Sequence, residues 1–149
     1  MIDPFDDEYF MKIALQEATS AFDKNEVPVG AVIVFNKQII AKAHNLTETL
    51  TDVTAHAEMQ AFTAASNTLG GKYMKDCTLY VTLEPCQMCA GASYWSQIGT
   101  IVFGASDPER GYQKLGTQLH PKTRVKSGIL AEECSLLIKR FFVEKRNLN

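Results

Sequence analysis

The stretch Cys77-Thr-Leu-Tyr-Val-Thr-Leu-Glu-Pro-Cys-Gln-Met-Cys89 joins an apolar run to a P-C-x-x-C motif. The run Cys77–Thr82 is typical of a buried β-strand, and a short helix is predicted from Cys86 onward. Two thiols three positions apart share one face of a helix, and the positive helix N-terminus favours the thiolate form that binds metal. The stretch therefore predicts a strand followed by a helix that begins with two metal ligands.

A second motif, His56-Ala57-Glu58, lies earlier in the chain and spells H-x-E. Together with Cys86 and Cys89, the imidazole of His56 makes a set of three zinc ligands, and Glu58 adds a carboxylate that the metal does not need. Structural zinc sites usually take four protein ligands, whereas catalytic sites take three and leave a place for water. The ligand count therefore indicates zinc-activated water chemistry, with Glu58 as the proton carrier.

Each half of this pattern is a weak signal when it stands alone. A lone C-x-x-C can be a redox pair, half of a structural zinc site or a chance match, and a lone H-x-E usually has no function. The two halves in this order, each at a predicted helix start, favour the catalytic interpretation. A structural site would need a fourth ligand from Cys77 or Cys134, and both are typical of buried core thiols.

The remaining sequence predicts alternating helices and strands around these motifs. We expect helices from Asp3-Pro4 to about Lys24, over 55–69, from Cys86, and from Leu130 to the C-terminus, and strands over 30–35, 38–43, 77–82, 100–105 and 123–126. Asn36-Lys37 is expected to be a hairpin turn, 45–54 a polar loop, and 106–122 a long connection with room for a short helix. This order predicts an α/β fold, a three-layer α/β/α arrangement with a central mixed five-stranded sheet. A chain of 149 residues fits a single domain, 1–149.

Charge and composition limit the location and the partners of the protein. The net charge of -2 excludes a protein that binds nucleic acid through its overall charge. No apolar run approaches the ~20 residues that a membrane span needs, and the acidic start Met1–Glu8 lacks the features of a signal peptide. We therefore expect no membrane partner and a cytoplasmic protein with reduced thiols.

Basic residues are concentrated in two segments of the chain. Residues 107–126 hold five basic and two acidic residues, and residues 139–146 hold four basic and one acidic residue. Such segments beside the site would suit RNA phosphates. A solvated helix face with ion pairs four residues apart accounts for the same pattern, so both interpretations stay open.

The motifs and their surroundings resemble the bacterial tRNA-specific adenosine deaminases, a family within the zinc-dependent cytidine deaminase-like superfamily, whose known signature is H-x-E…P-C-x-x-C. The resemblance spans nearly the whole chain and is found in 27–32, 54–58, 79–91, 101–105 and 128–134. It implies a zinc-dependent hydrolase that converts the wobble adenosine of a tRNA anticodon stem-loop to inosine. It also implies one Zn²⁺ per subunit on His56, Cys86 and Cys89, with Glu58 as the catalytic proton shuttle.

The resemblance implies further residues and a partner. It places Val29, Asn45, Asp107 and Phe142 at the substrate, and it implies a homodimer whose interface includes the helix 86–94, where the small residues 90–92 would permit close packing. The segment 107–116 departs from the commoner family loop, which runs through a small-residue Gly-Ser stretch. This segment would border the substrate, so the sequence defines the target less closely than it defines the chemistry.

Two rival functions fit parts of the same sequence. A deaminase of a free base or nucleoside, such as guanine or cytosine, would share the fold but needs a closed lid, often from the C-terminal segment. A tRNA enzyme needs an open mouth with basic groups, which the tail 139–146 favours. A structural zinc or RNA-binding module, the third interpretation, has no use for Glu58.

Overall fold

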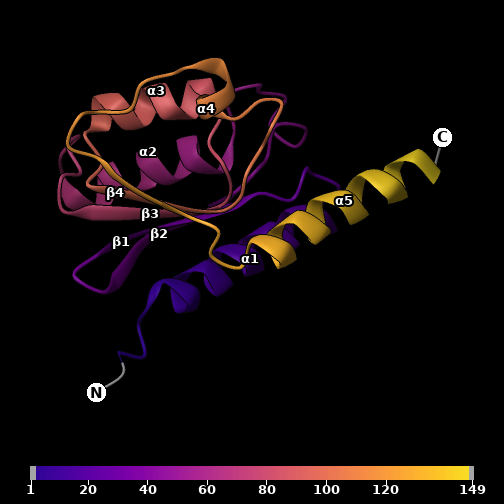
Figure 1. Cartoon of the computed structure of the whole chain (residues 1–149), viewed down its shortest axis with the longest axis horizontal. Helices are drawn as coiled ribbons and strands as arrows, with labels where there is room; N and C mark the ends of the chain where they lie inside the picture. The colour runs from indigo at the N-terminus through magenta and orange to yellow at the C-terminus, as the bar shows by residue number, and fades with distance from the viewer. Residues whose placement is uncertain (1–2, 148–149) are drawn as a thin grey trace.

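The computed structural model describes residues 3–147, so Met1 and Ile2 of the acidic start, and residues 148–149, lie outside it. Its elements are α1 (Asp7–Asp23), β1 (Gly30–Phe35), β2 (Gln38–His44), α2 (Ala57–Leu69), β3 (Cys77–Leu83), α3 (Gln87–Ser96), β4 (Thr100–Ala105), α4 (Tyr112–Leu115), β5 (Arg124–Ser127) and α5 (Ala131–Asn147). One sheet lies between two helical layers, with α2, α3 and α4 on one face and α1 and α5 on the other (Figure 1). This arrangement confirms the predicted three-layer α/β/α class.

The sheet has the strand order β2-β1-β3-β4-β5 and is mixed, as predicted. β1 pairs antiparallel with both β2 and β3, whereas β3, β4 and β5 run parallel to one another. Asn36 and Lys37 form the β1–β2 turn with positive φ angles of 51° and 62°, a conformation that matches the twist of a two-residue hairpin. The parallel strands β3 and β4 both end at the edge of the sheet where α2 and α3 begin.

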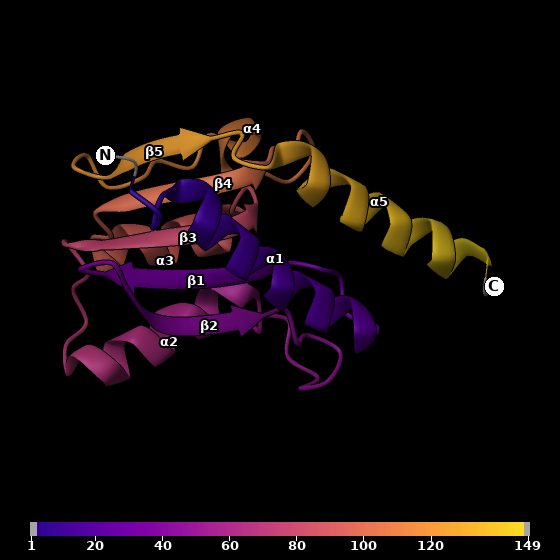
Figure 2. The same ribbon diagram turned by 90° about the horizontal axis from the view of Figure 1, so that it is seen from below.

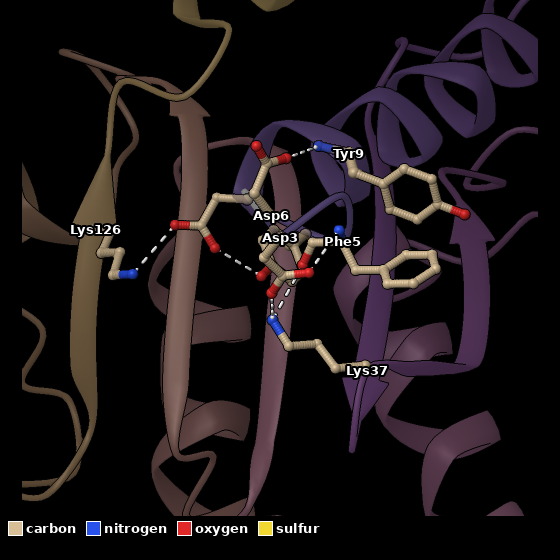
Figure 3. A network of polar contacts seen from close by, with 8 residues as sticks. Asp3, Phe5, Asp6, Tyr9, Lys37 and Lys126 are labelled. Atoms are coloured by element: carbon tan, nitrogen blue, oxygen red, sulfur yellow. Dashed lines mark hydrogen bonds and ion pairs between the residues drawn. The ribbon is translucent and has the colours of Figure 1, made fainter. Parts of the chain in front are cut away.

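The first helix begins later than the sequence indicated, because Asp6 and not Asp3 caps it. The Asp6 carboxylate accepts a hydrogen bond from the Tyr9 N–H at 2.9 Å, which satisfies one of the unpaired N–H groups at the helix start. Asp3 instead accepts from the Phe5 N–H at 2.9 Å and pairs with Lys37 of the hairpin turn at 2.6 Å. Figure 3 shows this network, which ties the start of the chain to the hairpin.

Asp7 connects the start of α1 to the interior of the sheet. Its carboxylate accepts from the buried Tyr80 hydroxyl of β3 at 2.7 Å and pairs with Lys126 of the edge strand β5 at 3.1 Å. Each partner therefore satisfies one oxygen of this carboxylate. Lys126, one of the basic residues of the segment 107–126, is used for this contact (Figure 3).

The two faces of the sheet bury separate apolar clusters. The cluster under α2 and α3 includes Ile33, Leu79 and Phe103, and the cluster under α1 includes Phe10 and Met11. α1 packs so closely on β1 that a Cβ atom at Gly30 would meet the Ala14 carbonyl oxygen of the helix. This close packing leaves no room for a side chain at the start of β1.

The last helix, α5, is only partly packed against the sheet. Cys134 and Phe141 are buried, whereas Leu136, Phe142 and Val143 are exposed. Figure 2 shows the C-terminal part of α5 extending past the carboxyl ends of the parallel strands. Within residues 3–147, no helix combines the length and the apolar character that a membrane crossing requires.

Candidate active site

Three predicted ligands, His56, Cys86 and Cys89, meet at the carboxyl edge of the parallel strands. The His56 Nδ1 atom lies 3.6 Å from the Cys86 Sγ atom and 3.6 Å from the Cys89 Sγ atom. All three ligand atoms lie within 4.8 Å of one another. A tetrahedral zinc with bonds of about 2.0–2.3 Å separates its ligand atoms by roughly 3.5 Å, so the spacing fits a zinc ion.

Two helix starts bring these ligands together. His56 is the N-cap of α2 and Cys86 is the N-cap of α3, both with extended backbone, so each helix begins one residue after its ligand. Neither N-cap side chain makes a capping hydrogen bond, and both side chains face the ligand cluster instead. The two positive helix ends point toward the cluster and stabilise negative thiolates there.

Hydrogen bonds within the cluster favour the thiolate form of Cys86. Hydrogen bonding to the Cys89 thiol, with a further bond to His56, lowers the pKa of Cys86 to about 4. The same contacts raise the pKa of His56 and raise the pKa of Cys89 above its ordinary value. The contacts within the cluster therefore favour the deprotonated form in which cysteine binds a metal.

Glu58 lies in the first turn of α2, beside the ligand cluster. Its side chain is 3% exposed, and its Oε1 atom has no hydrogen-bond partner within residues 3–147. This burial raises the pKa of Glu58 to about 7. An unpaired buried carboxylate is costly, and a cation with a water molecule beside it would satisfy the open oxygen. The donor set and this oxygen together fit a zinc ion with a reacting water.

A cavity of about 220 Å³ opens above the cluster. Its lining includes His56, Glu58 and Cys86, while Cys89 is buried and outside the lining. The predicted substrate residues Val29, Asn45 and Asp107 also line it, as does Arg110 of the basic segment 107–126. The sequence did not single out the further lining residues Val27, Thr47, Leu83 and Glu84. Phe142 is not in the lining and is 46% exposed on α5, so its contact with substrate stays a prediction.

Glu26 fixes one wall of the cavity, the loop 45–54. Its carboxylate is fully buried and accepts from the Glu48 N–H at 3.0 Å and from both the N–H and the hydroxyl of Thr49 at 2.6 Å. Those hydrogen bonds lower the pKa of Glu26 against the opposing effect of burial, so the carboxylate stays charged. The loop that holds Asn45 and leads into His56 is therefore anchored from inside.

Glu84 fixes a second segment beside the cavity, the turn 107–113, in the same way. One of its oxygens accepts from the Asp107 N–H at 3.0 Å and the other accepts from the Gln113 N–H at 3.1 Å. The side chain is 5% exposed and lies two residues before Cys86. In the sequence, the position of Glu84 between an apolar run and the P-C-x-x-C motif could have indicated a role at the site. Its partners, however, are backbone groups more than twenty residues away.

The basic segment 107–126 does not form one surface at the site. Of the basic residues of this segment, only Arg110 lines the cavity. Arg124 pairs in register with Thr100 at the opposite end of the sheet, and Lys126 pairs with Asp7. In the second segment, Arg140 pairs with Glu144 at 3.3 Å in the i,i+4 arrangement of a solvated helix face.

Comparison with known proteins agrees with this geometry. Residues 4–105 match the model of the cytidine and deoxycytidylate deaminase zinc-binding region, and the chain belongs to this class of deaminases. Within it, the chain belongs to the family of tRNA-specific adenosine deaminases. The Bacillus subtilis (strain 168) member is 47% identical over 146 residues, which cover 94% of this chain and 91% of the relative. The Aquifex aeolicus (strain VF5) member is 48% identical over 145 residues, with 94% and 96% covered.

Solved structures are similar to this chain in the same order, with a tRNA deaminase ahead of a guanine deaminase. One from a study of A-to-I editing by tRNA:A34 deaminases superposes with a TM-score of 0.82 at 40% identity, covering 87% of this chain and 98% of the other. A guanine deaminase from Bacillus subtilis is 36% identical with a TM-score of 0.64, and the match covers 73% of this chain and 67% of that one. The free-base deaminase is the more distant of these two.

In the metal-free protein, Glu58 should make stability fall as the pH rises. Its pKa lies above the ordinary 4.5, so between about pH 4.5 and pH 7 the folded state binds more protons than the unfolded state. We expect metal-stripped wild type to lose roughly 2–3 kcal/mol of unfolding free energy, relative to Glu58→Gln, between about pH 5 and pH 8. Urea unfolding of both proteins at the two pH values measures this difference, and an equal pH dependence in both would contradict it.

Proposed function

We propose that this protein deaminates adenosine to inosine at the wobble position of a tRNA anticodon. The observation that supports it most strongly is the buried Glu58 carboxylate, unpaired at Oε1 within residues 3–147, beside a three-ligand metal cluster on the floor of a cavity. A binding module would have no use for such a group, whereas hydrolysis needs a proton carrier beside the reacting water. The likeness to tRNA-specific adenosine deaminases over nearly the whole chain supports the substrate.

His56, Cys86 and Cys89 would hold the zinc. A zinc ion with three protein ligands keeps a coordination position for water and lowers the pKa of that water. The residues of the chain supply the remaining functions. Glu58 accepts one proton from the water as the water oxygen bonds to C6 of adenine, and delivers it to the ring nitrogen N1. It then accepts the second proton, from the new C6 hydroxyl, and delivers it to the amine, which leaves as ammonia when the C6–N bond breaks. Adenosine and water thus give inosine and ammonia.

The upper walls of the cavity would hold the extruded base. Val27, Val29 and Leu83 offer apolar surfaces of the kind that contact a flipped base. Asn45 is 7% exposed and its side chain is fixed by donating to the Val27 carbonyl at 3.3 Å and accepting from the Thr47 N–H at 3.3 Å. We assign Asn45 and Asp107 to polar contacts with the nucleoside, with Phe142 as a contact that would form only when RNA reaches α5.

Incubation with two kinds of substrate tests this function. We expect the zinc-loaded protein to release ammonia and form inosine in an anticodon stem-loop with adenosine at the wobble position. A stem-loop with guanosine there, and free guanine, cytosine and adenosine, are the comparisons. Mass spectrometry of the digested RNA and an ammonia assay give the readout. Ammonia from a free base alone would overturn the tRNA assignment in favour of a free-base deaminase.

We infer a homodimer that uses the outer face of α3. Trp95 is 77% exposed there and Tyr94 is 36% exposed, which is unusual for large aromatic side chains on a monomer. Open space surrounds the position where Gly91 would place a Cβ atom, so a second backbone could approach closely. Sedimentation equilibrium at micromolar concentration should give twice the chain mass, and a monomer mass would contradict this.

We also infer one domain and a cytoplasmic location. All five strands form one sheet with helices on both faces, which supports a single folding unit. Calorimetry should therefore show one cooperative transition. A tRNA substrate and metal-binding thiols that must stay reduced both suit the cytoplasm. Cell fractionation with antibody detection tests the location, and recovery outside the cytoplasmic fraction would contradict it.

A further inference from the structure

Arg110 is the one basic side chain that lines the cavity within residues 3–147, apart from the ligand His56. The same lining holds three carboxylates, Glu58, Glu84 and Asp107. The Arg110 side chain is exposed, and none of the ion pairs among the described residues involves it. Its guanidinium is therefore a cation at the mouth of an otherwise acidic cavity, with no ion-pair partner in the described part of the chain.

The backbone of Arg110 is fixed relative to the three predicted zinc ligands. Its N–H donates to the Asp107 carboxylate at 3.0 Å, in a turn that Glu84 anchors through the Asp107 N–H. The next residue, Gly111, forms an antiparallel bridge with Cys86. A Cβ atom at Gly111 would meet the Glu84 carboxylate, so the turn packs directly on that side chain. Arg110 is thus one residue from a backbone contact with a metal ligand.

A base that enters this cavity from a polynucleotide brings its flanking phosphates to the cavity mouth. An arginine fork matches the oxygens of a phosphate and binds them through charge-assisted hydrogen bonds. We propose that Arg110 binds a backbone phosphate of the RNA strand next to the nucleotide that enters the cavity. This inference rests on the proposed function, because only a polynucleotide substrate presents such a phosphate.

A pair of arginine variants provides the first test. Arg110→Gln removes the charge at the cavity mouth, and Arg124→Gln removes the same charge at the far end of the sheet. Both residues are exposed, so neither change should affect folding. We expect Arg110→Gln to raise KM for the stem-loop about tenfold at low salt with kcat unchanged. The slope of log KM against log salt should fall by about 0.7, the value for one phosphate contact on a single strand. Arg124→Gln should match wild type in both.

Neutral phosphates in the RNA identify the contact directly. Stem-loops with a methylphosphonate on the 5′ or the 3′ side of the target adenosine lack one charge each. One of them should bind wild type about tenfold more weakly, yet bind Arg110→Gln no more weakly than unmodified RNA does. Arg110→Lys, which keeps the charge without the fork, should recover part of the affinity.

The outcomes separate the two proposals. The phosphate contact would be overturned if the losses of affinity from Arg110→Gln and from the methylphosphonate RNA were additive. It would also be overturned if neither methylphosphonate weakened binding to wild type, or if Arg110→Gln and Arg124→Gln had equal effects. Absence of inosine in the wild-type reaction would overturn the proposed function instead. The binding measurements do not depend on turnover, so each result is assigned to one proposal.

Discussion

Glu58→Gln will lower the rate of deamination by about 10²–10⁴-fold and leave the zinc content unchanged. Glutamine fills the same buried space but cannot take up and return a proton. The Glu58 side chain is 3% exposed with one oxygen unpaired within residues 3–147. The other carboxylates of the cavity lining, Glu84 and Asp107, accept hydrogen bonds from backbone N–H groups. The measurement is single-turnover inosine formation with metal analysis of the same sample.

Glu109→Gln is the matched control for the Glu58 variant. It removes one negative charge from an exposed residue of the 107–113 turn, outside the cavity lining. We expect its rate to stay within about twofold of wild type, since surface changes of this kind have small effects. A Glu58→Gln protein with full activity would contradict the proton-transfer role. A Glu58→Gln protein without zinc would show that Glu58 contributes to metal binding.

Cys86→Ala will abolish zinc binding and, with it, activity. Two ligands remain, and the Cys86 Sγ atom that completes the set with His56 is gone. A ligand that binds only the folded state stabilises it in proportion to the logarithm of its concentration. A chelator should therefore lower the Tm of wild type and leave the Tm of Cys86→Ala unchanged. Metal analysis and thermal unfolding with and without chelator measure both effects.

Cys134→Ala separates loss of a ligand from loss of any thiol. Cys134 is a buried residue of α5, and burial raises the pKa of its thiol to about 12, so it stays protonated. This variant should lose some stability through the small space left in the core, yet keep one zinc per chain and its response to the chelator. Zinc loss from Cys134→Ala as well would point to a metal site that depends on overall packing.

The motifs and the alternation of strands and helices were enough to predict the layered fold and the three ligands. β1 and β4 have the predicted bounds, and His56, Cys86 and Cys89 meet because each predicted helix start faces one edge of the sheet. Helix starts were less well predicted. Asp3 and Asp6 are both able to cap a helix, and only the packed structure decides that Asp6 bonds to Tyr9 while Asp3 bonds to Phe5.

The walls of the cavity were harder to predict from sequence. Glu26 and Glu84 bind backbone N–H groups far along the chain, and a backbone donor leaves no trace in residue type or periodicity. Arg110 belonged to a basic segment whose members scatter once the chain folds. Phe142 was assigned through resemblance alone, and in this chain it lies on α5 outside the lining of the cavity.

The bridge between Cys86 and Gly111 bears on how this scaffold can change over generations. The turn 107–113 is attached to the segment of the zinc ligand Cys86 by backbone groups, including the Tyr112 N–H that donates to the Pro85 carbonyl at 2.9 Å. Side chains at 108–110 contribute nothing to that attachment and are exposed. Substitutions there can exchange the molecule that is recognised while the reaction is inherited intact, so this turn is where new targets can arise at little cost to the chemistry.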